Sequence, residues 1–142
     1  GEKVVVLSFW NCQCPVSKAY EERLKALDKK YKDEKVAVFA IDSNKINDLD
    51  RIRAYAKKHE LTYPVLKDWN NKIADKFGAE VTPEVFVIDK DKKIRYHGAF
   101  DDSKNPEHVE NHLVKDAVKA VLNGEDVKTK KHKAFGCTIK RV

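Results

Sequence analysis

The chain has 142 residues, enough for one domain with its own core, and its 42% hydrophobic content is ordinary for a globular protein. The net charge of +6 comes from lysines spread through every segment, and their modest run at residues 128–133 has no interleaved aromatic residues, so we expect no nucleic-acid binding. No run approaches the roughly 20 apolar residues that span a bilayer, so we expect no transmembrane segment, and three cysteines argue against a purely structural disulfide framework.

The first half of the chain predicts a strand, a helix, a strand and a helix in turn. Residues 4–10 form an apolar run typical of a buried strand. Pro15 suits the first position of a helix, which apolar residues at three- and four-residue spacing carry to about residue 32. Residues 36–41 predict a second buried strand, and a helix is expected over about residues 48–59. Two strands joined by a helical crossover are expected to run parallel.

Shorter elements are predicted next. Asn70 or Asn71 suits the cap of a brief helix, which Gly78 ends. Residues 85–88 and 93–97 flank a polar turn and predict an antiparallel hairpin.

The last predicted helix begins at Pro106 and ends at Gly124, and a Lys-rich tail, residues 125–142, carries Cys137. Without repeats or long linkers, residues 1–142 are expected to form a single domain. The element order predicts an α/β three-layer sandwich, with a mixed central sheet of four or five strands flanked by helices.

Cys14 is the first candidate for chemistry. It directly precedes Pro15, where the macrodipole and free backbone N–H groups at a helix N-terminus favour a thiolate. Thiolate is the nucleophile in disulfide exchange and in attack on peroxides. A buried structural cysteine is the alternative, but the position between a strand and a helix argues against it.

A second candidate feature is the pair Thr82 and Pro83, directly ahead of a predicted strand. The proline either begins the strand or follows a cis peptide bond, which would hold a backbone edge beside the thiol for a substrate to pair with. We expect Thr82, Pro83 and Trp10 to contact substrate, although aromatic residues at strand ends are usually core.

Four segments together resemble a known family. They are Phe9-Trp10 followed by Cys14-Pro15-Val16-Ser17-Lys18-Ala19-Tyr20, Thr82 to Asp89, Arg95-Tyr96-x-Gly98, and Gly136-Cys137-x-Ile139-Lys140. They are similar to the redoxin (alkyl hydroperoxide reductase/thiol-specific antioxidant) branch of the thioredoxin superfamily. The resemblance implies a thioredoxin-like fold and Pro83 as the cis-proline facing Cys14. We expect no cofactor.

The chain differs from thioredoxins and from peroxiredoxins at residues that take part in their reactions. Ser17 stands where thioredoxins have their second motif cysteine, and Ser8 replaces their acidic residue before the Phe. Asn11 and Leu7 stand where peroxiredoxins place a Thr or Ser and a Pro. A thiol–disulfide oxidoreductase is therefore the favoured function, and a thiol-dependent peroxidase is an alternative without a recognisable peroxide-activating pocket.

The resolving thiol is Cys137 or Cys12. A disulfide between Cys12 and Cys14 would close a very small, strained ring. The tail is long enough to bring Cys137 back over the sheet, where pairing with Cys14 would be relaxed, so Cys137 ranks slightly higher. Packing beside Phe135 and Ile139 is the non-catalytic alternative for Cys137.

Another alternative is a Cu(I) or other soft-metal site using Cys12 and Cys14, for which His108 and His112, at i, i+4 on the last predicted helix, are possible ligands. We otherwise expect no metal. Expected partners are protein or small-molecule disulfides and thiols and a redox partner protein, with the chain itself a monomer. No signal peptide is visible; the bacterial periplasm or cell envelope is the expected location, with the cytoplasm as the alternative.

Overall fold

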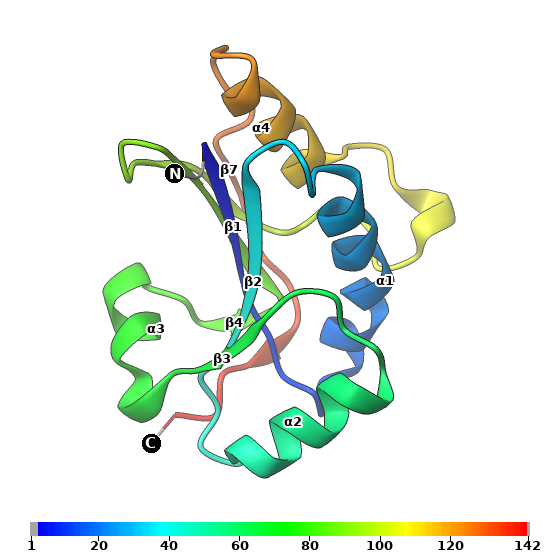
Figure 1. The fold of residues 1–142 in the computed structure, drawn as a ribbon, viewed down its shortest axis with the longest axis vertical. Helices are drawn as coiled ribbons and strands as arrows, with labels where there is room; N and C mark the ends of the chain where they lie inside the picture. Colours follow the sequence, from blue (N-terminus) through cyan, green and yellow to red (C-terminus); the bar gives the residue numbers. More distant parts are fainter. Residues whose placement is uncertain (1–2, 142) are drawn as a thin grey trace.

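The computed structural model describes residues 3–141, and its centre is a six-stranded mixed sheet with the order β3-β2-β1-β5-β6-β7 (Figure 1). The strands are β1 (Val4–Phe9), β2 (Val36–Asp42), β3 (Val65–Lys67), β5 (Glu84–Asp89), β6 (Ile94–Gly98) and β7 (Lys131–His132). β1 runs parallel to β2 and antiparallel to β5, and β5 and β6 form the expected antiparallel hairpin. The sheet exceeds the expected four or five strands because two residues of the tail add β7 beside β6.

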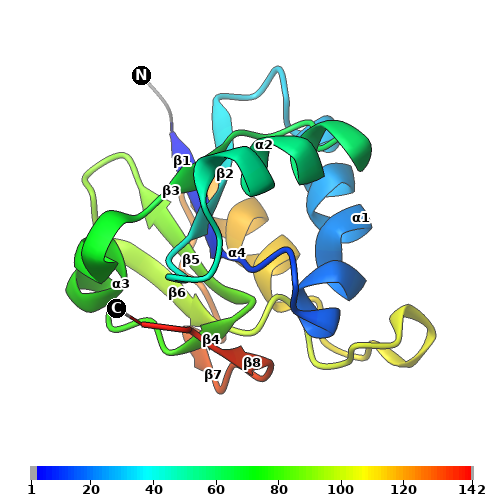
Figure 2. The ribbon, with the colours of Figure 1, turned by 90° about the horizontal axis from the view of Figure 1, so that it is seen from below.

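Helices cover both faces of this sheet. They are α1 (Pro15–Lys30), α2 (Leu49–Lys58), α3 (Lys72–Phe77) and α4 (Leu113–Leu122). Residues of α1, α2 and α4 join one hydrophobic cluster with one face of β1 and β5, and α3 packs with the other face (Figure 2). The expected three-layer α/β sandwich with a mixed sheet is confirmed.

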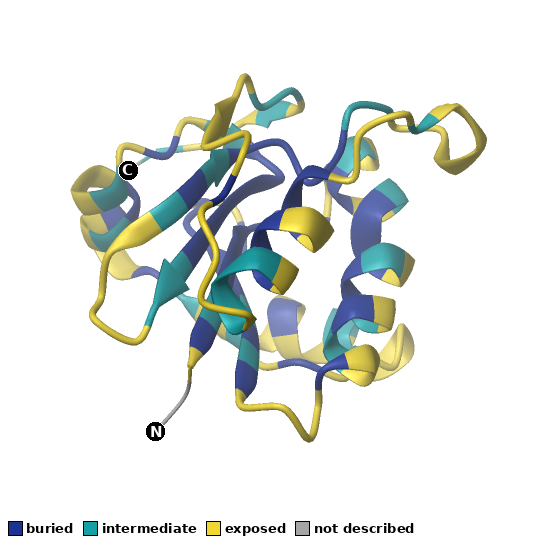
Figure 3. Cartoon of the chain, turned by 90° about the horizontal axis from the view of Figure 1, so that it is seen from above, coloured by how far each residue is buried: buried dark blue, intermediate teal, exposed yellow. Residues whose placement is uncertain are grey.

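The continuous apolar run of β1 follows from this double cover. Val4 and Val6 pack with α1 and α4, while Leu7 and Phe9 pack with α3, and all four are buried. Figure 3 shows the central strands largely in the colour of buried residues. Successive side chains of a strand point to opposite faces, so a strand covered on both faces must be apolar at nearly every position. Each such side chain stabilises the fold by about 1.5–3 kcal/mol.

The last helix begins later than predicted. Pro106 opens only a 3₁₀ turn, η2 (Pro106–His108), and α4 starts at Leu113. The chain becomes extended at Val109, and the backbone N–H groups of Glu110 and Asn111 donate to the Asp102 carboxylate instead of to helical carbonyls. A proline favours a helix start locally, but here a side chain from the preceding loop takes the donors that the next turn needs.

Asn71, one of the two predicted caps, is the N-cap residue of helix α3, but its side chain does not make the capping hydrogen bond. Asn71 adopts a left-handed conformation, and its side chain donates to the backbone and hydroxyl of Ser43. The Asp68 carboxylate instead accepts from the N–H groups of Ile73 and Ala74. Gly78 ends the helix at φ 73°, as expected.

After α4 the tail returns across the end of the sheet. Residues 137–138 form β8 (Cys137–Thr138), which pairs antiparallel with the short strand β4 (Val81–Thr82) just ahead of β5. Figure 2 shows β8 and β4 side by side, far from the N-terminal end of β1. This small second sheet brings Cys137 to the end of the molecule where α1 begins.

Candidate redox site

Cys14 stands at the start of α1, and the structure joins it to Cys137. Its backbone is extended (φ −93°, ψ 119°) because it holds the N-cap position, and Pro15 is the first helical residue. The disulfide links residues 123 positions apart, with a Cα–Cα distance of 6.0 Å. Cys12, the other candidate partner, is an unpaired buried thiol. Of the two pairings that the sequence left open, the structure contains the one with Cys137.

Thr82 and Pro83 lie against this disulfide. The Thr82–Pro83 peptide bond is cis, and both residues are buried. The Sγ atom of Cys14 lies 3.5 Å from the Thr82 carbonyl oxygen. On the other side, Thr82 pairs with Cys137 in the β4–β8 register, and its hydroxyl donates to the Cys137 carbonyl at 3.3 Å. The backbone edge expected to lie beside the thiol is therefore beside it, and it is occupied by the tail.

A glycine allows the tail to approach this closely. Gly136 adopts φ +153°, and a Cβ atom there would lie 1.9 Å from the Thr82 carbonyl oxygen. Such a distance is far inside van der Waals contact, so any side chain would push the tail away from β4. Gly136 is the residue that permits Cys137 to pair with Thr82.

Further contacts anchor the tail beyond Cys137. The N–H of Ile139 donates to the Glu80 carbonyl at 2.9 Å, and its side chain is buried in the cluster around α3. The N–H of Lys140 donates to the Asn44 side chain at 2.8 Å, while the Lys140 carbonyl accepts from the N–H of Lys45 at 2.7 Å. These contacts do not involve the disulfide, so the tail has a binding surface of its own.

The loop that carries Cys14 rests on a buried polar network that we did not predict from the sequence. The Asp42 carboxylate accepts from the side chains of Asn44 and Asn47, and Asn47 donates to Asn11 at 2.9 Å. Asn44 also donates to the Trp10 carbonyl at 3.4 Å. Burial raises the pKa of Asp42, against the lowering effect of these hydrogen bonds. The signal that could have revealed the network is the polar run directly after the second buried strand.

Glu84 fixes β4 from the side of β6. One carboxylate oxygen accepts from the N–H groups of Glu80, at 2.8 Å, and Val81, at 3.2 Å. The other pairs with His97, whose ring stacks on Phe86. Thr82 is thus held between a buried carboxylate network and the docked tail. No local pattern in the sequence indicates the pairing of Glu84 with His97.

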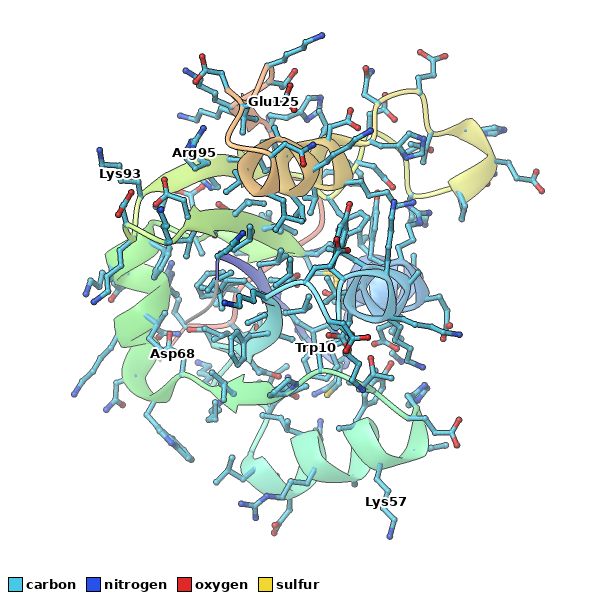
Figure 4. All side chains as sticks on the ribbon, turned by 45° about the horizontal axis from the view of Figure 1, so that its top comes forward. Trp10, Lys57, Asp68, Lys93, Arg95 and Glu125 are labelled. Carbon is cyan, nitrogen blue, oxygen red and sulfur yellow. A yellow bond between two sulfur atoms is a disulfide. The ribbon has the colours of Figure 1, made fainter. Side chains whose placement is uncertain are left out.

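Trp10 lies inside the molecule, in contrast to its expected contact with substrate. Only 2% of it is exposed, and its indole N–H donates to Glu21 at 3.1 Å. Its ring packs on Tyr55, whose hydroxyl also donates to Glu21. Figure 4 shows Trp10 on the side of the sheet where α1 and α2 lie. With the disulfide formed, Trp10 is therefore a core residue that packs below the loop that carries Cys14, and it does not line a surface for substrate.

Cys12 is also part of the interior. It is 3% exposed and belongs to the main hydrophobic cluster. Burial, with a smaller effect of the Asp42 carboxylate, raises the pKa of its thiol. Ser17, at the position of a second motif cysteine, is 1% exposed, and its hydroxyl accepts from the N–H of Asn11 at 3.4 Å. Neither side chain is presented for reaction with an external molecule.

The proposed ligands of the soft-metal site are not arranged for metal binding in the disulfide-bonded structure. Among residues 3–141 no group of three or more His, Cys, Asp or Glu side chains could hold a metal ion. Cys14 is already bonded to Cys137, and His108 and His112 do not share a helix because His108 belongs to η2 and His112 to the cap of α4. Within the same described range, no helix is both long and apolar enough to cross a membrane.

Solved structures share this architecture over nearly the whole chain. A hypothetical protein from Sinorhizobium meliloti 1021 has a TM-score of 0.90 at 32% identity, covering 99% of this chain and 81% of the other. An uncharacterised protein from Geobacillus kaustophilus has a TM-score of 0.92 at 28% identity, covering 99% and 78%. A thioredoxin-like protein solved in its oxidised form has a TM-score of 0.71 at 25% identity, covering 89% and 82%. The fold is thioredoxin-like.

Sequence comparison gives the family. The model of the AhpC/TSA family matches residues 1–97, and the chain belongs to this family. The thiol-disulfide oxidoreductase YkuV of Bacillus subtilis (strain 168) is 29% identical over 101 residues, which cover 70% of this chain and 68% of YkuV. ResA of Bacillus anthracis, also named a thiol-disulfide oxidoreductase, is 29% identical over 92 residues, or 65% of this chain and 52% of ResA. The chain thus spans about two thirds of the first relative and about half of the second.

Proposed function

We propose that the chain is a thiol–disulfide oxidoreductase in which Cys14 is the nucleophile and Cys137 the resolving thiol. Family membership and the named relatives make it an oxidoreductase at the level of enzyme class. The observation that carries the finer proposal is the Cys14–Cys137 disulfide at the N-terminus of α1, beside the Thr82 carbonyl.

In the reduced protein, the Cys14 thiolate attacks a substrate disulfide. The helix N-terminus stabilises the negative charge on sulfur, because unpaired backbone N–H groups and the helix dipole face it. One substrate sulfur leaves as a thiolate, and the other remains in a mixed disulfide with Cys14. Cys137 then attacks the Cys14 sulfur, expels the second substrate thiolate and closes the observed disulfide.

Thr82 and Pro83 are proposed to bind substrate by their backbone edge. In the oxidised protein, Cys137 and Thr138 occupy this edge as β8. An extended substrate segment in the reduced protein would pair with β4 in place of the tail, in the manner of strand addition to a sheet edge. Protein disulfides with an extended flanking segment are therefore the substrate class that the site fits.

Insulin reduction with a thiol reductant tests the proposal. Cys14→Ser should abolish catalysis, since no other thiol stands at the helix N-terminus. Cys137→Ser should instead accumulate a mixed disulfide on Cys14, detectable by mass spectrometry. Cys12→Ser is the matched control and should retain activity, because Cys12 is buried and unpaired. Full activity of Cys14→Ser would refute the proposal.

Other expectations stay predictions. We propose a periplasmic or envelope location, since redox-active disulfides persist in oxidising compartments, and cell fractionation tests it. The monomeric state is tested by sedimentation. No observation at the site favours the peroxidase or the copper-binding alternative over disulfide exchange; peroxide consumption and metal analysis after Cu(I) loading of the reduced protein test them.

A further inference from the structure

We propose that Cys137 is the sulfur through which the oxidised protein is reduced: an external thiolate attacks Cys137, and Cys14 is the leaving group. This inference rests on the proposed function and deepens it, because the two half-reactions would then enter through different cysteines. Oxidation of the protein by substrate begins at Cys14, whereas its re-reduction begins at Cys137.

The two sulfur-bearing residues differ in access. Cys14 is only 1% exposed, between the start of α1 and the Thr82 carbonyl. Cys137 is partly exposed and lies between two exposed residues, Gly136 and Thr138. With the tail docked, Cys14 is therefore buried and Cys137 is partly exposed.

The direction of attack adds to this difference. A thiolate approaches a disulfide sulfur along the line of the bond that breaks, from the side opposite the leaving sulfur. Attack on Cys137 therefore comes from the side away from Cys14, at a residue that is partly exposed and has exposed neighbours on both sides. Attack on Cys14 would come from the side away from Cys137, at a residue that is only 1% exposed.

The tail does not depend on the disulfide for its position. Ile139 is 3% exposed, and Lys140 exchanges two hydrogen bonds with residues 44 and 45. Phe135 packs on Tyr20 of α1 at a ring distance of 6.2 Å. Contacts on both sides of Cys137 must break to uncover Cys14, whereas Cys137 is already partly exposed while the tail is docked.

The reaction balances as an exchange. The external thiolate forms a new S–S bond with Cys137 as the Cys14–Cys137 bond breaks, and the electron pair passes to the Cys14 sulfur. Cys14 leaves as a thiolate at the helix N-terminus, the environment that stabilises it. A second external thiol then attacks the reductant's own sulfur in the mixed disulfide and releases Cys137. Two thiols are oxidised to one disulfide, the protein gains two electrons, and the two protons of the thiols remain with Cys14 and Cys137.

Mapping the first mixed disulfide tests the inference. The oxidised full chain, carrying Cys12→Ser to simplify the map, is mixed briefly with glutathione, quenched with acid and N-ethylmaleimide, and digested with trypsin. Cleavage after lysine separates residues 4–18, with Cys14, from residues 134–140, with Cys137. Glutathione should appear on the second peptide in roughly tenfold or greater excess. Equal distribution, or an excess on Cys14, would overturn the inference.

Two glycine variants provide a matched comparison. An alanine at Gly136 would collide with the Thr82 carbonyl, whereas a Cβ atom added at Gly124, also at positive φ, would have no atom within 4 Å. Gly136→Ala should therefore shift the adduct toward Cys14, and Gly124→Ala should keep the original distribution. If Gly136→Ala fails to fold, Ile139→Ala removes a buried anchor of the tail with the same expectation.

Failure of this inference and failure of the proposed function have different signatures. The mapping needs only the oxidised protein and a small thiol, and it reports which sulfur is attacked. Activity of Cys14→Ser in insulin reduction reports whether Cys14 is the nucleophile. An adduct on Cys14 together with an inactive Cys14→Ser would leave the function standing and remove only the role given to Cys137.

Discussion

The disulfide should contribute strongly to stability, because it closes a long loop. Cys14 and Cys137 are separated by 123 positions, and the chain-entropy relation for a loop of this length gives about 5 kcal/mol at 25 °C. With a urea slope of about 2.5 kcal/mol/M for a chain of this size, reduction should lower the unfolding midpoint by about 2 M. The stability difference between the oxidised and the reduced protein arises in the unfolded state, because the crosslink lowers its conformational entropy.

Urea unfolding followed by circular dichroism, on the oxidised and the reduced protein, measures this effect. Cys137→Ser should unfold near the midpoint of the reduced protein, whether or not a reductant is present. Cys12→Ser should keep the full difference between oxidised and reduced forms, because Cys12 takes no part in the crosslink. Coincident midpoints for oxidised and reduced wild type would refute the reasoning, since the loop closure would then have no effect on the unfolded state.

Three further predictions concern the buried groups around the site. Asn44→Ala should lower the free energy of unfolding, measured by urea titration, by about 2 kcal/mol, because it leaves the Lys140 N–H and the Trp10 carbonyl without their buried partner. The control Asn105→Ala, at an exposed helix cap, should lower it by less than about 1 kcal/mol. Burial raises the pKa of Asp42 above its usual 3.8, so the folded state binds the carboxyl proton more tightly than the unfolded state does. The protonated carboxyl therefore adds to the free energy of unfolding below pH 3.8, and this contribution is lost as pH rises through the folded-state pKa. Relative to Asp42→Asn, wild type should therefore lose stability across that window, and parallel pH profiles would contradict the assignment. Cys12 should react with iodoacetamide roughly 100-fold more slowly in the native than in the urea-unfolded protein, and comparable rates would show that the thiol is accessible.

Several elements were predictable because their determinants are local. The runs of β1, β2 and β5 are apolar as a direct result of burial on both faces of the sheet. Pro15 and Gly78 mark the start of α1 and the end of α3 through backbone preferences that belong to the residue itself. The predicted start of α4 was wrong for the opposite reason, because the Asp102 carboxylate competes for backbone donors eight and nine residues away.

The sequence by itself determined that Cys14 stands at a strand-to-helix junction, since Pro15 and the flanking apolar patterns are enough to place it. It left Cys12 and Cys137 both open as partners, because neighbours in sequence say nothing about a contact across 123 positions. Only the tertiary structure decided that pairing, through the β4–β8 ladder, Gly136 and the anchor of the tail on Asn44. Tertiary packing also turned Trp10 inward and buried Cys14 beneath the tail, because burial is a property of the assembled elements and not of any one of them.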